Sequence, residues 1–331
     1  MKVLVTGGAG FIGSTVALAL LDAGIDVVAL DDLSRGPAAF LRHYPSYVGD
    51  VADPRIVDRI FAEHPDISAA VHCAARTVVT ESLADPAGYY RSNVGKTIDF
   101  VSLLLSHGCR RLIFSSSASV YGTTSEPVIT ERTPPRPASP YARSKLIVEQ
   151  LLADICAATT MTAMSLRYFN PIGSDPQHRT GPYDSGPGDV MGTLLSASAT
   201  GEPFWIHGND WPTSDGTPVR DFVHVWDVAL AHVAALRSWP DLAWRDAHLV
   251  LNIGSGRGST VRELTEAFNR EAPRPVEVRY DGRRDGDIPG GYPDISKATT
   301  LLDWQPERGL RDGVRDALDW AATLRSGAAL Q

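Results

Sequence analysis

Short apolar runs alternate with longer amphipathic segments through the first half of the chain. Four runs rich in apolar and β-branched residues predict strands: Lys2–Thr6, Val27–Leu30, Ala69–His72 and Arg111–Ser116. The segments between them repeat apolar residues at helical spacing and predict helices: Ile12–Ala23, Arg55–His64 and Tyr89–His107. Strands that alternate with helices in this way are typical of a parallel sheet covered by helices on both faces.

The pattern changes after Asn170. A predicted helix, Tyr141–Ala157, and a predicted strand, Thr162–Arg167, still continue the alternation, but a passage rich in proline and glycine follows, which a wound sheet would not tolerate. A strand and a helix return over Asp221–Leu236. We therefore predict an α/β fold, a Rossmann-type doubly wound parallel sheet with a smaller C-terminal lobe. The sheet domain comprises residues 1–170 with 218–250 returning to it, and the lobe comprises residues 171–217 and 251–331.

Composition excludes several classes of protein. The chain has 331 residues, 43% of them hydrophobic and 21% charged, and no apolar run approaches the roughly 20 residues of a membrane span. The N-terminus leads directly into the first strand and leaves no room for a secretory signal, so we expect a cytoplasmic protein. A formal charge of −8 disfavours binding to nucleic acid. Cys73, Cys109 and Cys156 are widely spaced, which predicts reduced thiols and no metal site.

The turn after the first predicted strand is rich in glycine. Gly7, Gly10 and Gly13 are spaced as G-x-x-G-x-x-G, between the strand and the start of the first predicted helix. Without Cβ atoms in the turn, backbone N–H groups can approach a phosphate, and the helix N-terminus adds partial positive charge. By itself such a motif is often only a turn. Its position here predicts a site for the pyrophosphate of NAD, with Phe11 and Ile12 at the start of the helix.

Acidic residues follow the next two strands. Asp31 and Asp32 end the second strand, at the distance from the glycine turn where a carboxylate binds the adenosine ribose diol. A carboxylate there repels a 2′-phosphate and favours NAD over NADP. Arg35 could serve NADP, but we interpret it as a surface arginine. Asp50, followed by Val51, is predicted to lie near the adenine amine.

The predicted helix after Pro140 carries a candidate catalytic pair. Tyr141 and Lys145 are four residues apart and therefore share one helix face. Lowering the pKa of a tyrosine from about 10 to about 7 requires roughly 4 kcal/mol of phenolate stabilisation, which Lys145 and the positive nicotinamide of NAD⁺ can supply. A run of serines, Ser115–Ser119, ends a strand upstream, and one of them would hydrogen-bond the substrate oxygen that Tyr141 deprotonates.

The chain resembles the extended short-chain dehydrogenase/reductase family, and within it the UDP-sugar 4-epimerases. The resemblance runs almost from end to end. It is carried by TGGAGFIG, ES-x3-P-x2-YY from Glu81, FSSSASVYG, SPYARSK, LRYFNP, GNDWPTSDGTPVRDFVHV from Gly208, and RRDGD from Arg283. The glycine turn and the Tyr/Lys pair mark only the superfamily. The long block from Gly208 is more selective and indicates the epimerases.

The resemblance implies three sets of functional residues. The catalytic set is Ser117, Tyr141 and Lys145. Residues implied to contact NAD are Gly7, Gly10, Phe11, Ile12, Asp31, Asp32, Asp50, Val51, Cys73, Ala74, Ala75, Arg76, Asn93, Ser115, Tyr141, Lys145 and Tyr168. Residues implied to surround the nucleotide sugar are Ser117, Tyr141, Phe169, Asn170, Gly188, Asp189, Val190, Trp205, His207, Arg220, Arg284, Asp287 and Gly291.

The reaction implied by the resemblance is 4-epimerisation of a UDP-sugar through a 4-keto intermediate, with UDP-glucose and UDP-galactose as substrates. The family also implies a homodimer formed by the two long helices. Two alternatives stay open. One is another nucleotide-sugar epimerase or dehydratase acting on a different nucleotide or sugar, although Ala118 and Ser119 stand where a dehydratase needs carboxylates. The other is a non-catalytic NAD-binding protein, which would have no reason to retain the catalytic three.

Four positions depart from the family pattern. The loop that usually reads P-N-N-L is Pro187–Val190 here, which brings the Asp189 carboxylate near the nucleotide. His207 replaces an apolar residue beside the base, and Arg76 replaces a lysine near the phosphates. Gly291 stands where a tyrosine would exclude 2-N-acetyl sugars, so we expect UDP-GlcNAc and UDP-GalNAc to be accepted as well. Alternatively, Gly291 serves only a turn and Tyr292 fills the space. His224 and His232 are predicted to be ordinary core or surface histidines.

Overall fold

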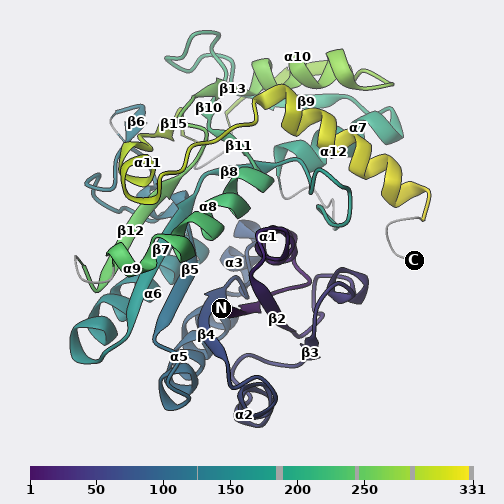
Figure 1. The fold of residues 1–331 in the computed structure, drawn as a ribbon. Coiled ribbons are helices and arrows are strands. Elements are labelled where there is room, and N and C mark those ends of the chain that lie inside the picture. The colour runs from purple at the N-terminus through teal and green to yellow at the C-terminus, as the bar shows by residue number, and fades with distance from the viewer. Residues whose placement is uncertain (125, 184–188, 243–245, 284–287, 328–331) are drawn as a thin grey trace.

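The structure is a computed structural model that describes residues 1–124, 126–183, 189–242, 246–283 and 288–327. Its largest element is a seven-stranded sheet in which all neighbouring strands are parallel (Figure 1). The strands in sheet order are β12 (His248–Ile253), β7 (Thr162–Tyr168), β5 (Arg111–Ser117), β4 (Ile67–His72), β1 (Lys2–Thr6), β2 (Asp26–Asp31) and β3 (Ser46–Val48).

The sheet order reverses direction at β1. The chain runs outward from β1 through β2 to β3, and then returns to the other side of β1 to form β4, β5 and β7. In open parallel sheets of this type, ligands bind at the carboxyl ends of the strands beside such a reversal. The glycine-rich turn follows β1 at this point, and the segment that begins with Cys73 follows β4.

Helices cover both faces of the sheet, as the sequence pattern predicts. Because side chains alternate along a strand, Val3 and Val5 of β1 pack in one apolar cluster and Leu4 packs in another. The first cluster includes residues of α1 (Phe11–Asp22) and α8 (Val225–Arg237). The second includes residues of α2 (Pro54–Glu63), α5 (Lys96–Ser106) and α6 (Pro140–Ala158). The doubly wound α/β fold is confirmed.

The helix predicted over Tyr89–His107 is divided in the structure. Its place is taken by α4 (Pro86–Tyr90), a π-helical turn, η2 (Arg91–Gly95), and α5. Turns of this wider type occur often at functional sites. This one carries Asn93, whose side chain bonds the backbone at Arg76. A further short helix, α3 (Val79–Ala84), precedes α4 and was not predicted.

The remaining elements form small sheets and helices at the top of Figure 1. A four-stranded sheet has the order β13 (Ser259–Thr260), β10 (Val219–Arg220), β15 (Gly290–Pro293) and β6 (Val128–Ile129). Two pairs are β11 (Phe222–His224) with β8 (Asn170–Ile172), and β14 (Val278–Asp281) with β9 (Phe204–His207). The helices are α7 (Val190–Thr200), α10 (Val261–Glu271) and α12 (Leu310–Arg325), which share a third apolar core.

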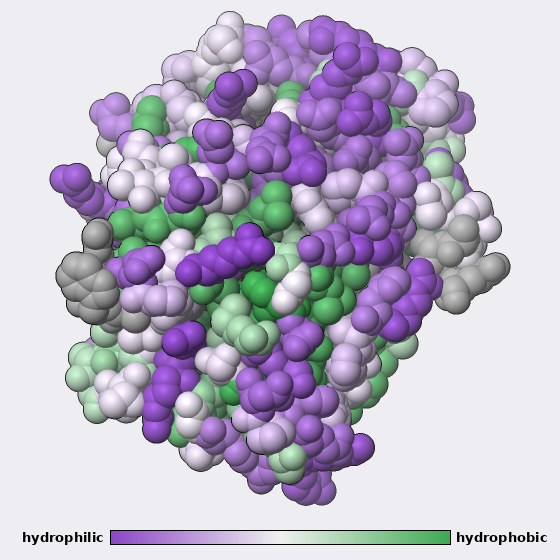
Figure 2. All heavy atoms as spheres, viewed as in Figure 1, coloured by the Kyte–Doolittle hydropathy of each residue, from purple (hydrophilic) through white to green (hydrophobic). Residues whose placement is uncertain are grey.

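Short elements complete the described chain: η1 (Ala38–Leu41), η3 (Ala118–Tyr121), α9 (Trp239–Leu242) and α11 (Ser296–Leu302). Hydrophilic side chains cover most of the face seen in Figure 2, and hydrophobic ones gather towards its middle. Within the described ranges, no helix is both long and apolar enough to cross a membrane. The three cysteines are free thiols, and Cys109 and Cys156 are buried.

Candidate active site

The glycine-rich turn between β1 and α1 leaves no space for side chains. Gly7 has a φ of +71°, and a Cβ atom added there would lie 2.7 Å from the backbone nitrogen of Ala74. A Cβ at Gly13 would lie 2.1 Å from the carbonyl oxygen of Gly7, so the first turn of α1 packs directly on the glycine-rich turn. Gly10 is the N-cap of α1 and supplies no side-chain acceptor to the helix amides. This cradle fits the pyrophosphate of a dinucleotide.

Asp31 and Asp32 play different structural roles. Asp31 is buried, and its carboxylate accepts hydrogen bonds from the backbone N–H groups of Ala9 at 2.9 Å and Leu33 at 2.7 Å. Burial raises the pKa of Asp31, and the two backbone hydrogen bonds oppose that rise. Asp32 is exposed and accepts a hydrogen bond from the backbone of Ser34 in its own turn. Asp31, rather than Asp32, is therefore the carboxylate built into the glycine-rich turn.

The predicted adenine-side residue Asp50 has a partner that the sequence reasoning missed. The carboxylate forms an ion pair with the ammonium of Lys96, at the start of α5, and also accepts from the backbone of Ala52 at 3.0 Å. The next residue, Val51, is buried. A lysine 46 residues away along the sequence gives no local signal of this pairing. The carboxylate is therefore held in place from a neighbouring helix.

Asn93 anchors the segment that follows β4. Its Oδ1 accepts from the backbone N–H of Arg76 at 2.8 Å, and its Nδ2 donates to the Arg76 carbonyl at 2.9 Å and to Oγ of Ser144 at 3.1 Å. The Arg76 guanidinium pairs with Asp85 at 2.8 Å and lies 4.3 Å from the centre of the Tyr89 ring. Asn93 thus positions the Cys73–Arg76 segment against α6 beside the glycine-rich turn.

The candidate catalytic side chains meet where β5 ends and α6 begins. Ser139 caps α6 by accepting from the backbone of Ala142 at 3.2 Å, and Pro140 is its first residue, so Tyr141 stands at the start of the helix. The Lys145 Nζ donates to the backbone carbonyl of Ser115 at 2.6 Å. It lies 5.9 Å from the centre of the Tyr141 ring.

Burial determines the protonation chemistry of this pair. It lowers the pKa of Lys145 to about 8, because the ammonium is removed from water. Burial also raises the pKa of Tyr141, and a hydrogen bond with Ser117 opposes that rise. The sequence reasoning expected Lys145 and the positive nicotinamide of NAD⁺ together to lower the pKa of Tyr141. Among the protein's own groups, desolvation of the phenolate is the largest effect.

Tyr168 is held by a histidine that was interpreted as an ordinary core or surface residue. The Tyr168 hydroxyl lies 2.5 Å from Nε2 of His232, and Nδ1 of the same ring lies 2.9 Å from the carbonyl oxygen of Val228. A carbonyl oxygen can only accept, so Nδ1 carries the proton and Nε2 accepts from the tyrosine. Tyr168 also hydrogen-bonds Ser115, which in turn bonds Cys73. The candidate cofactor residues at the carboxyl ends of β4, β5 and β7 therefore form one cluster.

The residues predicted to bind the nucleotide sugar come from the smaller sheets. Asn170, in β8 and directly after Phe169, is exposed. Arg220, in β10, is half-buried and donates to the carbonyl oxygen of Val219 at 2.8 Å. The Asp189 carboxylate accepts from the backbone of Gly192 at 2.7 Å and so caps α7, which begins at Val190. Its cap role was not foreseen. Three further predicted residues, Gly188, Arg284 and Asp287, lie outside the described residues.

Strand β9 presents two residues predicted to surround the nucleotide sugar, Trp205 and His207. Its burial alternates, with Phe204 and Ile206 buried and Trp205 43% exposed. The Arg279 guanidinium lies 5.7 Å from the Trp205 ring. His207 is half-buried, and its Nδ1 lies 3.9 Å from a carboxylate oxygen of Asp281.

Gly291 lies within a strand rather than a turn. It sits in β15 between β10 and β6, opposite Arg220. A Cβ at Gly291 would lie 2.6 Å from the carbonyl oxygen of Pro127 and 3.1 Å from Cδ1 of Ile129. The neighbouring Tyr292 packs elsewhere, because a Cβ added at Gly258 would meet its ring at 2.6 Å. The absence of a side chain at 291 thus permits the close approach of β6.

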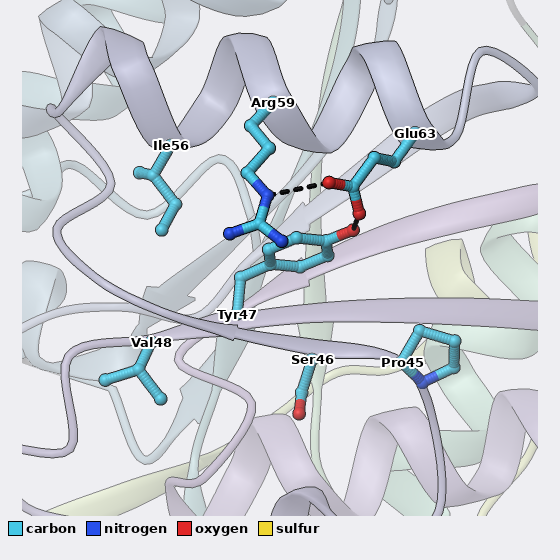
Figure 3. Close-up of a pocket in the computed structure, with 7 residues that line it drawn as sticks. All are labelled: Pro45, Ser46, Tyr47, Val48, Ile56, Arg59 and Glu63. Carbon is cyan, nitrogen blue, oxygen red and sulfur yellow. Dashed lines mark hydrogen bonds and ion pairs between the residues drawn. The ribbon is translucent and has the colours of Figure 1, made fainter.

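A surface hollow at the outer edge of the large sheet is separate from these residues. β3 and α2 line it, and none of the predicted site residues is among the lining residues (Figure 3). Its polar groups already bond one another: Nε of Arg59 donates to Glu63 at 2.7 Å, and the Tyr47 hydroxyl donates to the same carboxylate at 2.5 Å. We therefore do not include the residues of this hollow in the candidate site.

The fold and this site define a Rossmann-type dinucleotide-binding protein with a Tyr/Lys pair beside the cofactor cradle. Residues 3–254 match the model of the NAD dependent epimerase/dehydratase family. Over 338 residues the chain is 37% identical to the UDP-glucose 4-epimerase of Bacillus subtilis, covering 99% of this chain and 98% of that protein. The chain therefore belongs to the NAD dependent epimerase/dehydratase family.

Solved structures of similar proteins agree with this assignment. A UDP-glucose-4-epimerase from Stenotrophomonas maltophila, with bound NAD and formylated UDP-arabinopyranose, is 36% identical, has a TM-score of 0.95 and covers 99% of both chains. A UDP-Glc/GlcNAc 4-epimerase from Campylobacter jejuni is 33% identical with a TM-score of 0.84, over 97% of this chain and 99% of that one.

Proposed function

We propose that this protein is a UDP-sugar 4-epimerase that interconverts UDP-glucose and UDP-galactose. The observation that carries the proposal is the convergence of Tyr141, Lys145 and Ser117 at the ends of β5 and α6, beside the glycine-rich turn after β1. Membership of the family and the full-length similarity to UDP-glucose 4-epimerases support it. Asp31, Asp50, Asn93 and the glycine-rich turn would hold NAD.

The chemistry divides between cofactor and protein. NAD held by these residues would supply the hydride acceptor and donor for the reaction. Tyr141 removes the proton of the sugar 4-hydroxyl and later gives it back, while Ser117 hydrogen-bonds the same sugar oxygen. Lys145, held by the Ser115 carbonyl, stabilises the phenolate of Tyr141 by its charge. Arg220 would anchor the diphosphate, so that the sugar alone is loosely held and can turn.

The experiment that tests this proposal is product analysis with Tyr141→Phe. Without the phenol oxygen there is no base at the 4-hydroxyl, so kcat for UDP-galactose should fall by roughly a hundredfold to ten-thousandfold. Tyr47→Phe is the matched control, since Tyr47 lies in the remote surface hollow and should retain activity. If wild type bound NAD but formed no epimer from UDP-galactose, the non-catalytic NAD-binding alternative would gain and the proposal would fail.

We propose further that N-acetylated UDP-sugars are substrates, because Gly291 adds no bulk beside Arg220. Wild type should then interconvert UDP-GlcNAc and UDP-GalNAc. A panel of UDP-, CDP- and dTDP-sugars, analysed by product, tests both this and the identity of the base beside His207. Turnover of UDP-galactose with none of UDP-GalNAc would refute the N-acetyl proposal. Gly291→Tyr is a poor test alone, since any Cβ there meets the Pro127 carbonyl.

We also propose that two copies associate through α5 and α6. Each helix carries an exposed isoleucine, Ile98 at 42% and Ile147 at 38% exposure. Light scattering after size exclusion should give a dimer for wild type and a monomer for Ile98→Glu combined with Ile147→Glu. A variant on another exposed apolar residue, Val48→Glu in β3, should leave the dimer intact. A wild-type monomer would refute this proposal.

A further inference from the structure

Helix α6 carries a second buried charged residue besides Lys145. Glu149 lies one helical turn further along and is only 4% exposed. The proposed mechanism uses Tyr141 and Lys145 and gives Glu149 no part. A carboxylate taken out of water is costly unless it is paired and hydrogen-bonded, so its partners show what it holds.

Two neighbouring strands supply the partners of Glu149. Nε of Arg167 donates to one carboxylate oxygen at 2.9 Å and its NH2 donates to the other at 2.5 Å, a bidentate arrangement. The Ser116 hydroxyl donates to the first oxygen at 2.5 Å. Ser116 and Arg167 are cross-strand partners in β5 and β7. Each directly precedes a site residue, Ser117 in β5 and Tyr168 in β7.

The far side of the arginine is also fixed. Its guanidinium lies 4.8 Å from the centre of the Tyr121 ring. The Tyr121 hydroxyl donates to Oδ1 of Asn252 in β12 at 2.6 Å, and Nδ2 of Asn252 donates to the carbonyl oxygen of Ile129 in β6 at 3.1 Å. The ion pair therefore has one position relative to three strands of the large sheet, and α6 takes its position from the pair.

Glu149 also affects the charge of Lys145. The groups that face this lysine are His72 at the end of β4, Cys73 directly after it, the Ser115 carbonyl from β5, and Tyr141 and Glu149 from α6 itself. Burial lowers the pKa of Lys145 to about 8, and charge interactions with Cys73 and Glu149 oppose that shift. The charge of the ammonium that stabilises the phenolate therefore depends in part on this carboxylate.

We propose that the Glu149–Arg167 ion pair is the positioning element of the catalytic helix, holding α6 against β5 and β7 and keeping Lys145 charged beside Tyr141. This inference rests on the proposed function for the roles of Tyr141 and Lys145. A pair that served stability alone would make the same contacts, but removing its charge would not alter the titration of Tyr141. That difference is measurable.

The test is a pH titration of the near-ultraviolet phenolate absorbance of the NAD-loaded protein, with Tyr141→Phe subtracted to isolate Tyr141. In Glu149→Gln the carboxylate charge is lost, Lys145 deprotonates earlier, and the Tyr141 transition should move to higher pH by about one unit. The same loss should lower kcat at neutral pH about tenfold, since one pKa unit corresponds to a tenfold change in population. KM should change less than twofold, because Glu149 touches no substrate.

A remote buried pair provides the matched control. Asp227 in α8 is fully buried and bonds Arg308 at 2.8 Å, so Asp227→Asn removes a comparable charge away from the site. It should lower the melting temperature without moving the Tyr141 titration or kcat. If Glu149→Gln does not fold, the double variant Glu149→Met with Arg167→Met replaces the pair by apolar groups, which proteins often tolerate.

The outcomes separate cleanly. A Tyr141 titration and a kcat that match wild type in Glu149→Gln, or in the double variant, would overturn the inference. A shifted titration supports it, even if no nucleotide sugar is turned over. In that case the proposed function fails and the positioning of Lys145 and Tyr141 stands.

Discussion

Lys145 and Ser115 are joined by a hydrogen bond of 2.6 Å from the lysine ammonium to the serine backbone carbonyl. This contact ties α6 to the end of β5 and fixes the ammonium without using any side-chain oxygen. The Ser115 hydroxyl stays available to bond Tyr168 and Cys73. A single residue of the strand therefore contacts both the candidate catalytic lysine and the neighbouring candidate cofactor residues.

Replacing Lys145 should abolish most activity without unfolding the protein. Lys145→Met removes the charge that stabilises the phenolate, and we expect kcat to fall by roughly a hundredfold or more with a much smaller change in KM. Steady-state kinetics with UDP-galactose measures this. Lys297→Met is the matched control, because Lys297 also donates to a backbone carbonyl, that of Val250 at 2.9 Å, outside the candidate site. Equal losses in both variants would contradict the role of Lys145.

Gly7→Ala should impair folding and NAD retention together. The alanine would need a left-handed φ, which costs about 1 kcal/mol, and its Cβ would press on Ala74 at 2.7 Å. Gly24→Ala separates the two effects, since Gly24 has a φ of +75° but nothing within 4 Å of an added Cβ. Differential scanning calorimetry should show a clearly larger drop in melting temperature for Gly7→Ala. Equal drops would show that the close contact between position 7 and Ala74 does not contribute to stability.

Asp31→Asn should weaken NAD binding far more than Asp32→Asn. Asp31 accepts two backbone hydrogen bonds that shape the glycine-rich turn, and hydrogen bonds to a charged group contribute about 1.5–3 kcal/mol each. Loss of one such contribution lowers affinity by roughly tenfold to a hundredfold. Isothermal titration of the NAD-free protein measures the affinities. An Asp32→Asn variant that lost as much as Asp31→Asn would contradict the separation of roles.

The stability of the protein should depend on pH through Asp221. This carboxyl is fully buried, and burial raises its pKa from 3.8 to about 6, against hydrogen bonds from Ser255, Gly256 and Arg257. Because the folded pKa lies above the unfolded one, the folded state binds the extra proton between those values. The contribution of Asp221 to stability is therefore largest below pH 3.8 and declines as the pH rises towards 6.

The measurement compares wild type with Asp221→Asn by denaturant unfolding at several pH values. Relative to Asp221→Asn, wild type should lose up to about 3 kcal/mol of unfolding free energy between pH 4 and pH 7. One pKa unit corresponds to about 1.4 kcal/mol. Asp294→Asn is a control, because Asp294 is half-buried and its pKa is lowered rather than raised, by hydrogen bonds from Ser296. A difference that did not vary with pH would contradict this assignment.

The sheet and the catalytic helix could be predicted because their signals are local. β1 has the bounds that the sequence predicted, and α6 begins one residue before Tyr141. Apolar alternation and the cap at Ser139 are properties of adjacent residues. Such signals can be recognised in the sequence without knowing which distant segments the strand or helix contacts.

The parts that could not be predicted depend on distant contacts. Lys96 meets Asp50, and His232 meets Tyr168, only because the fold brings separate elements together. Asp189 gave a second local signal that the sequence reasoning did not use: an Asp before an apolar run is a typical helix N-cap, and it caps α7 here. The packing around Gly291 could not be predicted either, because the strand that packs against it, β6, is far away in the sequence.

The packing of Gly291 has an evolutionary consequence. Since the Pro127 carbonyl occupies the space that a Cβ would need, a larger residue cannot arise at position 291 by one substitution without displacing β6. Under the proposed function, in which position 291 borders the sugar, narrowing the pocket from this side therefore requires paired changes at 291 and along residues 127–129. Sugar preference would then be coupled to the path of a two-residue strand.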